Sequence, residues 1–181
     1  MSIKNTIDTT KCHFFYGGNF SQWATSHFLY HGYEFNTAEQ FMMFAKAVVF
    51  NDVGAATRIM ASKKPQEQKA LGRAVKGFQQ EVWDREAVNI VLLGNLLKFT
   101  QNPHMQSFDA SELFVEASPT DKIWGIGLGM ENDRRFDYLE WKGQNLLGQV
   151  ITEIRNFLIG NPDPDFFANL TLAREVLRLD R

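Results

Sequence analysis

The sequence contains a single cysteine, Cys12, among its 181 residues. This excludes an internal disulfide and any metal site built from several cysteines, and it is compatible with a reducing cytoplasm. The four histidines form no helical i, i+4 pair, and His27 and His31, in a strand-like segment, would lie about 13 Å apart. We therefore expect neither a metal site nor any other cofactor.

The chain also lacks an excess of basic residues and any long apolar run. Its 19 Lys and Arg residues against 21 Asp and Glu residues give a formal charge of −2. Without a basic surface to hold a phosphate backbone, nucleic acid is expected as a partner only when it carries a recognised modification. No segment approaches the roughly 18 apolar residues of a membrane span, and the N-terminus has no apolar signal segment. We expect a cytoplasmic protein that does not contact membranes.

Composition and periodicity predict an α+β, predominantly helical fold in one compact domain over residues 1–181. A hydrophobic fraction of 44% is typical of a globular domain. Strands are expected at 13–16 and 112–117, and residues 28–35 are expected to form a strand or a tight hairpin with its bend at Gly32. Helices are expected at 36–50, 51–61, 65–75, 80–100 and 103–108, in a segment that ends near 160, and in the last segment up to 180. Residues 161–181 would form a C-terminal helical extension.

The predicted helix from Asn36 to Phe50 carries two charged residues, Glu39 and Lys46, in otherwise apolar surroundings. Seven residues apart, they face nearly the same side, roughly 10 Å apart along the axis, so a sugar-sized ligand would fit between them. Glu39 would alternatively complete a capping box that begins at Asn36, and Lys46 would alternatively extend its amine to water. A lysine held in apolar surroundings has a lowered pKa, which makes its amine nucleophilic.

The segment from Gly125 to Gly129 places glycine at every second position. A dinucleotide-binding fingerprint needs the spacing GxGxxG between a strand and a helix, which this segment does not have. We interpret it as backbone that passes close to a ligand such as a diphosphate or a sugar. A plain flexible loop is the alternative.

Several spaced motifs together resemble the NADAR, or YbiA-like, family, which is associated with NAD and ADP-ribose metabolism. The resemblance covers roughly residues 13–158. The matching residues are Asn19-Phe20, Thr37-Ala38-Glu39-Gln40 with Lys46, Gly72-Arg73, Trp83, Lys98-Phe99, Glu116-Ala117-Ser118 with Asp121, Trp124-Gly125 and Gly127, and Trp141, Gly143, Asn145 and Leu147-Gly148.

This resemblance implies a compact, mostly helical α+β fold and cleavage of N-glycosidic bonds at a ribose C1 atom. It also implies that Lys46 attacks C1 and forms a Schiff base, with Glu39 as the acid and base. Such chemistry needs a proton for the leaving base and a nucleophile for the electron-poor C1 atom. Asp121 would orient the ribose hydroxyls or assist Lys46; the alternative is an aspartate that caps a turn.

Eight further residues are predicted to contact the substrate. The aromatic ones would stack on a base, although buried aromatic residues are more often part of the core. Gln40 and Asn145 would donate hydrogen bonds to the substrate, with helix capping as the alternative. The residues are Asn19, Phe20, Gln40, Trp83, Trp124, Gly125, Gly127 and Asn145.

Two classes of function follow from these patterns. The first is an N-glycosidase without a cofactor that acts on ADP-ribosylated guanine, as a small molecule or in nucleic acid, or on early phosphorylated intermediates of riboflavin synthesis. The second is a module that binds ADP-ribose or a nucleotide without turning it over, in which Glu39 is only a cap. A purely structural role is a third possibility, and the lysine in an apolar helix argues against it.

Overall fold

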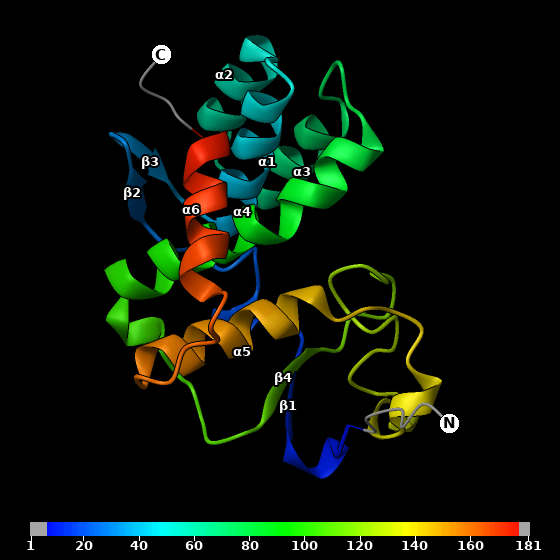
Figure 1. Ribbon diagram of the computed structural model, residues 1–181. Helices are drawn as coiled ribbons and strands as arrows, with labels where there is room; N and C mark the ends of the chain where they lie inside the picture. Colours follow the sequence, from blue (N-terminus) through cyan, green and yellow to red (C-terminus); the bar gives the residue numbers. More distant parts are fainter. Residues whose placement is uncertain (1–6, 178–181) are drawn as a thin grey trace.

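The structure is a computed structural model that describes residues 7–177. It confirms the predicted α+β, predominantly helical fold in a compact domain (Figure 1). Among these residues, no helix combines the length and hydrophobicity that a membrane crossing needs. The helices are α1 (Ala38–Val49), α2 (Val53–Ala61), α3 (Pro65–Arg73), α4 (Gln80–Gln101), α5 (Leu146–Leu158) and α6 (Phe166–Val176), and the strands are β1 (Cys12–Phe15), β2 (Phe28–Tyr30), β3 (Tyr33–Phe35) and β4 (Leu113–Glu116).

One sequence prediction was too long. The expected helix at 103–108 is a single 3-10 turn, Pro103–Met105, followed by irregular backbone. Of the two possibilities for residues 28–35, the hairpin is confirmed: β2 and β3 pair antiparallel, because His31 and Gly32 both have positive φ and reverse the chain. Residues 178–180 of the predicted C-terminal helix lie outside the described residues.

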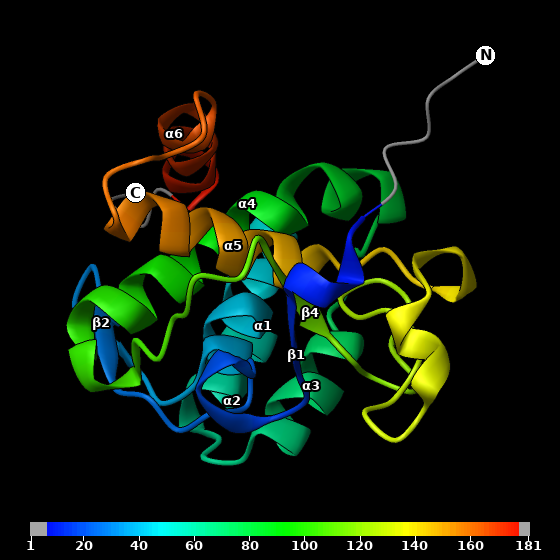
Figure 2. The ribbon, with the colours of Figure 1, turned by 90° about the horizontal axis from the view of Figure 1, so that it is seen from below.

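Strands β1 and β4 form a parallel pair, although α1 to α4 separate them in the sequence. Phe15 at the end of β1 lies opposite Glu116 at the end of β4. The N–H group of Ala117 continues the pairing by donating to the Phe15 carbonyl oxygen at 2.8 Å. Helix α5 packs against β4, and Figure 2 shows the two strands side by side below it. The loops that follow both strands therefore begin at one edge of this pair.

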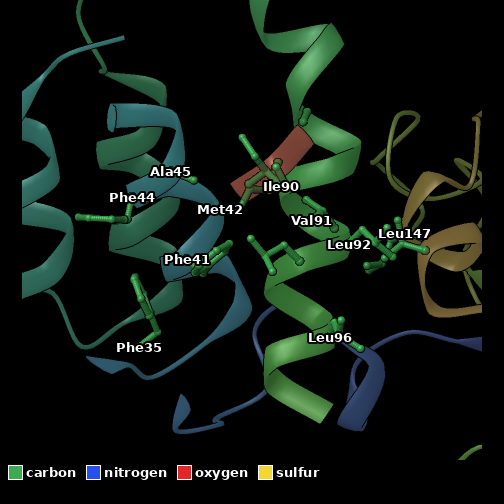
Figure 3. Close-up of a cluster of buried hydrophobic side chains, with 14 of the residues drawn as sticks. Phe35, Phe41, Met42, Phe44, Ala45, Ile90, Val91, Leu92, Leu96 and Leu147 are labelled. Atoms are coloured by element: carbon green, nitrogen blue, oxygen red, sulfur yellow. The ribbon is translucent and has the colours of Figure 1, made fainter. Parts of the chain in front are cut away.

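Helix α4 is the centre of the hydrophobic core (Figure 3). It packs against α1 on one side and against α5 on the other, and α6 also contacts it. Its successive residues Ile90 to Leu93 are all almost fully buried, as expected for a helix that is apolar around most of its circumference. Phe41 and Met42 of α1 and Leu147 of α5 face it across the two interfaces. The core thus fixes α1, the helix that carries Glu39 and Lys46.

Gly94 allows the close approach of α4 to α1. A Cβ atom at Gly94 would stand 2.6 Å from Cδ1 of Phe41, a ring that is 1% exposed and packed on all sides. The matched control is Gly54 of α2, where the nearest atoms to an added Cβ are 3.6 Å away. We expect Gly94→Ala to be less stable than Gly54→Ala by about 1–3 kcal/mol in urea unfolding, because of overpacking. Equal stabilities of the two variants would contradict this packing.

Candidate functional site

The start of α1 differs from the predicted capping box by one residue. The N-cap is Thr37, not Asn36, and its side-chain oxygen accepts the Gln40 N–H at 3.0 Å. Gln40 Oε1 in turn accepts the Asn36 N–H at 2.8 Å. The capping interpretation of Glu39 is therefore wrong, because Gln40 performs that role. The Glu39 carboxyl remains free of the cap, although the residue is only 5% exposed.

Glu39, Glu116 and Asp121 form a carboxylate cluster from α1, the end of β4 and the loop that follows it. Burial raises the pKa of Glu39 to about 7, a shift that Lys69 opposes and that the charge of Asp121 increases. Burial, and then the charge of Asp121, likewise raises the pKa of Glu116 to about 7. Glu116 Oε2 is fully buried and has no hydrogen-bond partner within residues 7–177. Two carboxyl groups of this cluster are thus partly protonated near neutral pH.

Helix α3 provides the positive charge beside this cluster. Lys69 and Arg73 are four residues apart on one face of α3, and both lower the pKa of Glu39. Between them, Gly72 packs so tightly on α1 that an added Cβ would overlap the Met43 side chain. This close approach brings the basic face of α3 to the start of α1.

The loop that precedes β2 completes the surroundings of Glu39. Its Trp23 side chain hydrogen-bonds the Glu39 carboxyl, and the Gln22 carbonyl oxygen accepts the Glu39 N–H at 2.9 Å. Two side chains of α4 donate hydrogen bonds to this loop. Asn95 Nδ2 donates to Gln22 Oε1 at 2.7 Å, and Lys98 Nζ donates to the Ser21 carbonyl oxygen at 2.9 Å. The fully buried Lys98 therefore supports the loop, and burial lowers its pKa to about 7.

Lys46 lies two turns after Glu39, with its amine against aromatic rings. Nζ is 4.1 Å from the ring centroid of Phe78 and 5.5 Å from that of Trp83. Within the described part of the chain, no side-chain or backbone oxygen accepts a hydrogen bond from this amine. Burial lowers the pKa of Lys46, and the positive charge of Arg73 lowers it further. The charge of Arg73 thus lowers the pKa of both predicted catalytic residues of α1, Glu39 and Lys46.

Asp121 caps a turn, which is the alternative weighed from the sequence, and its predicted role toward the ribose or Lys46 stays a prediction. Its Oδ1 accepts the N–H groups of Ile123 and Trp124, at 2.9 and 2.8 Å, so it caps a turn. Its negative charge nevertheless raises the pKa of both glutamates in the carboxylate cluster. The structure therefore brings Asp121 together with Glu39.

The two predicted amide contacts are used within the protein. Gln40 Nε2 donates to carbonyl oxygens at the end of α2, including those of Ile59 and Ser62 at 3.0 and 3.1 Å. Asn145 Oδ1 accepts the Glu116 N–H at 2.9 Å, and its Nδ2 donates to the Phe114 carbonyl oxygen. Asn145 therefore positions the backbone of Glu116. We assign both amides a supporting role.

The predicted aromatic contacts have different surroundings. Phe20 is 4% exposed and packs among other rings, so it belongs to the core. Trp83 is buried beside the Lys46 amine, and Trp124 is partly buried and packs against the core. Asn19 lines an open cavity with the glycines that precede it.

The glycine segment passes close to protein backbone. A Cβ at Gly125 would stand 2.9 Å from the Glu116 carbonyl oxygen and 3.2 Å from that of Asp121. Gly127 has φ +69°, and an added Cβ would be 3.0 Å from Lys142. These glycines therefore let the chain fold tightly around the carboxylate cluster, which explains the spacing without a ligand.

Sequence analysis did not assign site roles to Trp23, Lys69, Arg73 or Glu116. The i, i+4 spacing of Lys69 and Arg73 shows that they share a helix face, but their contact with α1 depends on packing at Gly72. Glu116 and Arg73 occur in the motifs that carry the family resemblance, which was the available signal. Within residues 7–177, no group of three or more His, Cys, Asp or Glu side chains is arranged to hold a metal ion.

The comparisons with known proteins agree with this site. A family model described as the NADAR domain matches residues 14–159. The chain belongs to the NADAR family. The match includes every residue of the carboxylate cluster as well as Lys46, and it ends just after α5. Helix α6, which packs on α4, lies beyond it.

Relatives of this NADAR protein include two proteins named N-glycosidases. One, from Acanthamoeba polyphaga mimivirus, is 40% identical over 165 residues, which span 82% of this chain and 97% of that protein. The other, from Nostoc punctiforme, is 32% identical and spans 67% of this chain and 76% of that protein. The solved structure of the Escherichia coli protein YbiA superposes with a TM-score of 0.65 at 22% identity, covering 82% of this chain and 84% of that one. This last similarity shows a shared fold.

Proposed function

We propose that the protein is an N-glycosidase that hydrolyses the bond between a ribose C1 atom and a base nitrogen, with ADP-ribosylated guanine as the substrate. The observation that carries this proposal is the pairing, on α1, of a buried carboxyl with a pKa of about 7 and an amine whose pKa is lowered. Near neutral pH such a pair supplies both a proton and a nucleophile. The two relatives named N-glycosidases support the same reaction class.

In the proposed first step, Lys46 Nζ forms a bond to C1 while the bond from C1 to the base nitrogen breaks. The protonated Glu39 carboxyl transfers its proton to the departing base. A proton then moves from the attached amine to the ring oxygen as the bond from C1 to that oxygen breaks, which leaves a protonated Schiff base. Water adds to C1 and releases Lys46 as the amine, and the remaining proton returns to Glu39. The sum is substrate and water giving ADP-ribose and unmodified guanine, which stays part of its nucleotide.

The other residues of the site fit this sequence of steps. Lys46 must be neutral to attack, and both its burial and Arg73 favour the neutral amine. Burial, and to a smaller extent the charge of Asp121, raises the pKa of Glu39 and so keeps its carboxyl partly protonated near neutral pH. Lys69 and Arg73 place two cations beside Glu39, and their charge favours the carboxylate that forms once the proton has been delivered.

A module that only binds ADP-ribose is the second candidate. Such a module has no need for a buried carboxyl that is partly protonated near neutral pH, since keeping a carboxyl there opposes ionisation and costs stability. We therefore favour the enzyme. The riboflavin-pathway intermediates remain the alternative substrates, because they share the ribose C1–N bond.

A substrate panel tests the proposal. ADP-ribosylated guanine as a mononucleotide, the same modification in an oligonucleotide, and a phosphorylated ribosylamino-pyrimidine are incubated with the protein. Chromatography then measures the ADP-ribose released from the guanine substrates and the base released from the pyrimidine. We expect cleavage of the guanine substrates to be at least about 10-fold faster than cleavage of the pyrimidine. Faster cleavage of the pyrimidine would replace the substrate but keep the reaction. Stoichiometric calorimetric binding of ADP-ribose without cleavage of any of these substrates would identify a binding module instead.

A further inference from the structure

A second polar cavity lies at the end of β1, next to the carboxylate cluster but distinct from it. It has a volume of about 470 Å³ and is open to solvent. The polar side chains in its wall belong to His13, Tyr16, Asn19 and Ser107, all of which can donate hydrogen bonds. Neither a carboxylate nor a lysine or arginine is among its lining residues within the described chain. The histidine is thus the one lining group there that can carry charge.

The imidazole of His13 is held in one orientation. Its Nδ1 lies 2.6 Å from Asp109 Oδ2, and its ring stacks on Phe114 with the centroids 5.0 Å apart. Phe20 packs against the same ring edge-on at 5.4 Å. A carboxylate is only an acceptor, so Nδ1 must carry the proton of this hydrogen bond. Nε2 is left as the ring nitrogen that a ligand can reach.

Asp109 is itself fixed and ionised. Burial raises its pKa, but hydrogen bonds from His13 and Ser111 outweigh that effect and bring it to about 2. Behind it, Arg155 Nη1 donates to the Asp109 carbonyl oxygen at 3.1 Å, and Arg155 is 8% exposed. The hydrogen bonds of this buried guanidinium go to neutral oxygens within residues 7–177. A histidine paired with a carboxylate and backed by a cation is suited to hold an anion.

The cavity is also within reach of the carboxylate cluster. His13 lies opposite Phe114 in the β1–β4 pair, and Glu116 follows two residues later on the same face. The strand spacing and the rise per residue then place the Cα atoms of His13 and Glu116 roughly 8 Å apart. Gly17 and Gly18 also line the cavity, and nothing lies within 4 Å of an added Cβ at either residue. A ligand can therefore lie directly on this backbone.

We propose that this cavity binds the diphosphate of the substrate, with a proton taken up at His13 Nε2 on binding so that this nitrogen becomes the main donor, and with Asn19 and Ser107 as further donors. The inference rests on the proposed function for the identity of the ligand, because the proposed substrate carries a diphosphate attached to its ribose. Such a cavity would favour substrates in which the ribose is followed by a diphosphate over substrates that end at a ribose 5′-phosphate. The binding of a diphosphate by itself does not depend on turnover.

The test uses inorganic pyrophosphate and the intact chain. We expect calorimetry to show saturable binding that His13→Phe weakens by about 10-fold, since the variant keeps the ring packing but loses one charge-assisted hydrogen bond. His104→Phe, which replaces an exposed histidine, is the control and should bind as the wild type does. The imidazole nitrogen resonances of His13 should move during the titration. Asp109→Asn serves as a second variant, with the same direction of effect, should His13→Phe not fold.

Pyrophosphate binding and turnover are measured separately, so the phosphate site and the proposed enzyme activity can fail independently. Lys46→Ala should bind pyrophosphate with unchanged affinity even where it releases no base. With an ADP-ribosylated substrate, His13→Phe should raise KM by about 10-fold and leave kcat nearly unchanged. Equal pyrophosphate affinity in His13→Phe and the wild type, or resonance shifts at other histidines only, would overturn the phosphate site. Absence of base release with binding that still depends on His13 would overturn the enzyme and leave the site standing.

Discussion

Lys46→Ala is expected to reduce turnover of ADP-ribosylated guanine by about 10³-fold or more, because the nucleophile of the proposed reaction is removed. The substitution deletes an amine that contacts Phe78 and Trp83 and donates no hydrogen bond within the described residues. The fold should therefore remain intact. Lys46→Arg is expected to be as inactive as Lys46→Ala, since a guanidinium stays protonated and cannot form a Schiff base.

Borohydride reduction during turnover provides the direct measurement. We expect mass spectrometry of the wild-type protein to show a ribosyl adduct on the peptide that contains Lys46. Lys76→Ala, which removes an exposed lysine from the loop before α4, is the matched control and should keep both the adduct and full turnover. Full turnover by Lys46→Ala, or an adduct on another lysine, would show that the Schiff-base mechanism is wrong.

Glu39→Gln is expected to have opposite effects on activity and on stability. Base release should fall by about 10²–10⁴-fold, because glutamine cannot deliver a proton to the leaving base. The variant should at the same time be more stable than the wild type above pH 7. The folded-state pKa of about 7 lies above the model value of 4.5, so the folded state binds more protons between these pH values. The wild type therefore loses stability as the pH rises from about 4.5 to 7, and the loss is complete above that range.

Thermal unfolding at two pH values measures this effect. A shift of this size lowers the free energy of unfolding of the wild type by about 3 kcal/mol above pH 7. We therefore expect Glu39→Gln to raise Tm by roughly 10 °C at pH 8.5 and to leave it nearly unchanged at pH 4. The matched control is Glu81→Gln, since Glu81 has the same second position in α4 as Glu39 has in α1 but is exposed. Equal Tm values of Glu39→Gln and the wild type at pH 8.5 would show that the folded state does not raise the pKa of the Glu39 carboxyl.

Local features of the fold were predictable from the sequence. The helix from Asn36 to Phe50 and the long helix of α4 follow from apolar periodicity, which acts within a few residues. The cap at the start of α1 was placed one residue early, because Asn36 and Thr37 are both good N-caps and both are followed three residues later by a Glu or Gln. Only the backbone geometry decides between them.

The assembly of the site depends on contacts that local patterns do not encode. The carboxylate cluster joins Glu39 with Glu116, and that meeting requires the parallel pairing of β1 with β4. Whether Lys69 faces α1 or solvent depends on the depth at which α3 packs, which Gly72 sets. The charge pattern of the predicted helix pointed to Glu39 and Lys46, the family resemblance implied their roles, and the packing added the groups around them.

The pairing of β1 with β4 also determines when the site can form during synthesis. Residues up to the end of α4 contain Glu39, Lys46, Lys69 and Arg73, and helices α1 to α4 pack largely on one another. β1, however, has no strand partner until Leu113 to Glu116 have left the ribosome. Because such long-range pairing carries a large loop-closure entropy, it forms late in folding. A nascent chain that ends after α4 thus holds the amine and the first carboxyl but lacks Glu116 and Asp121, so the protein gains its complete set of acids only when most of its length has been made.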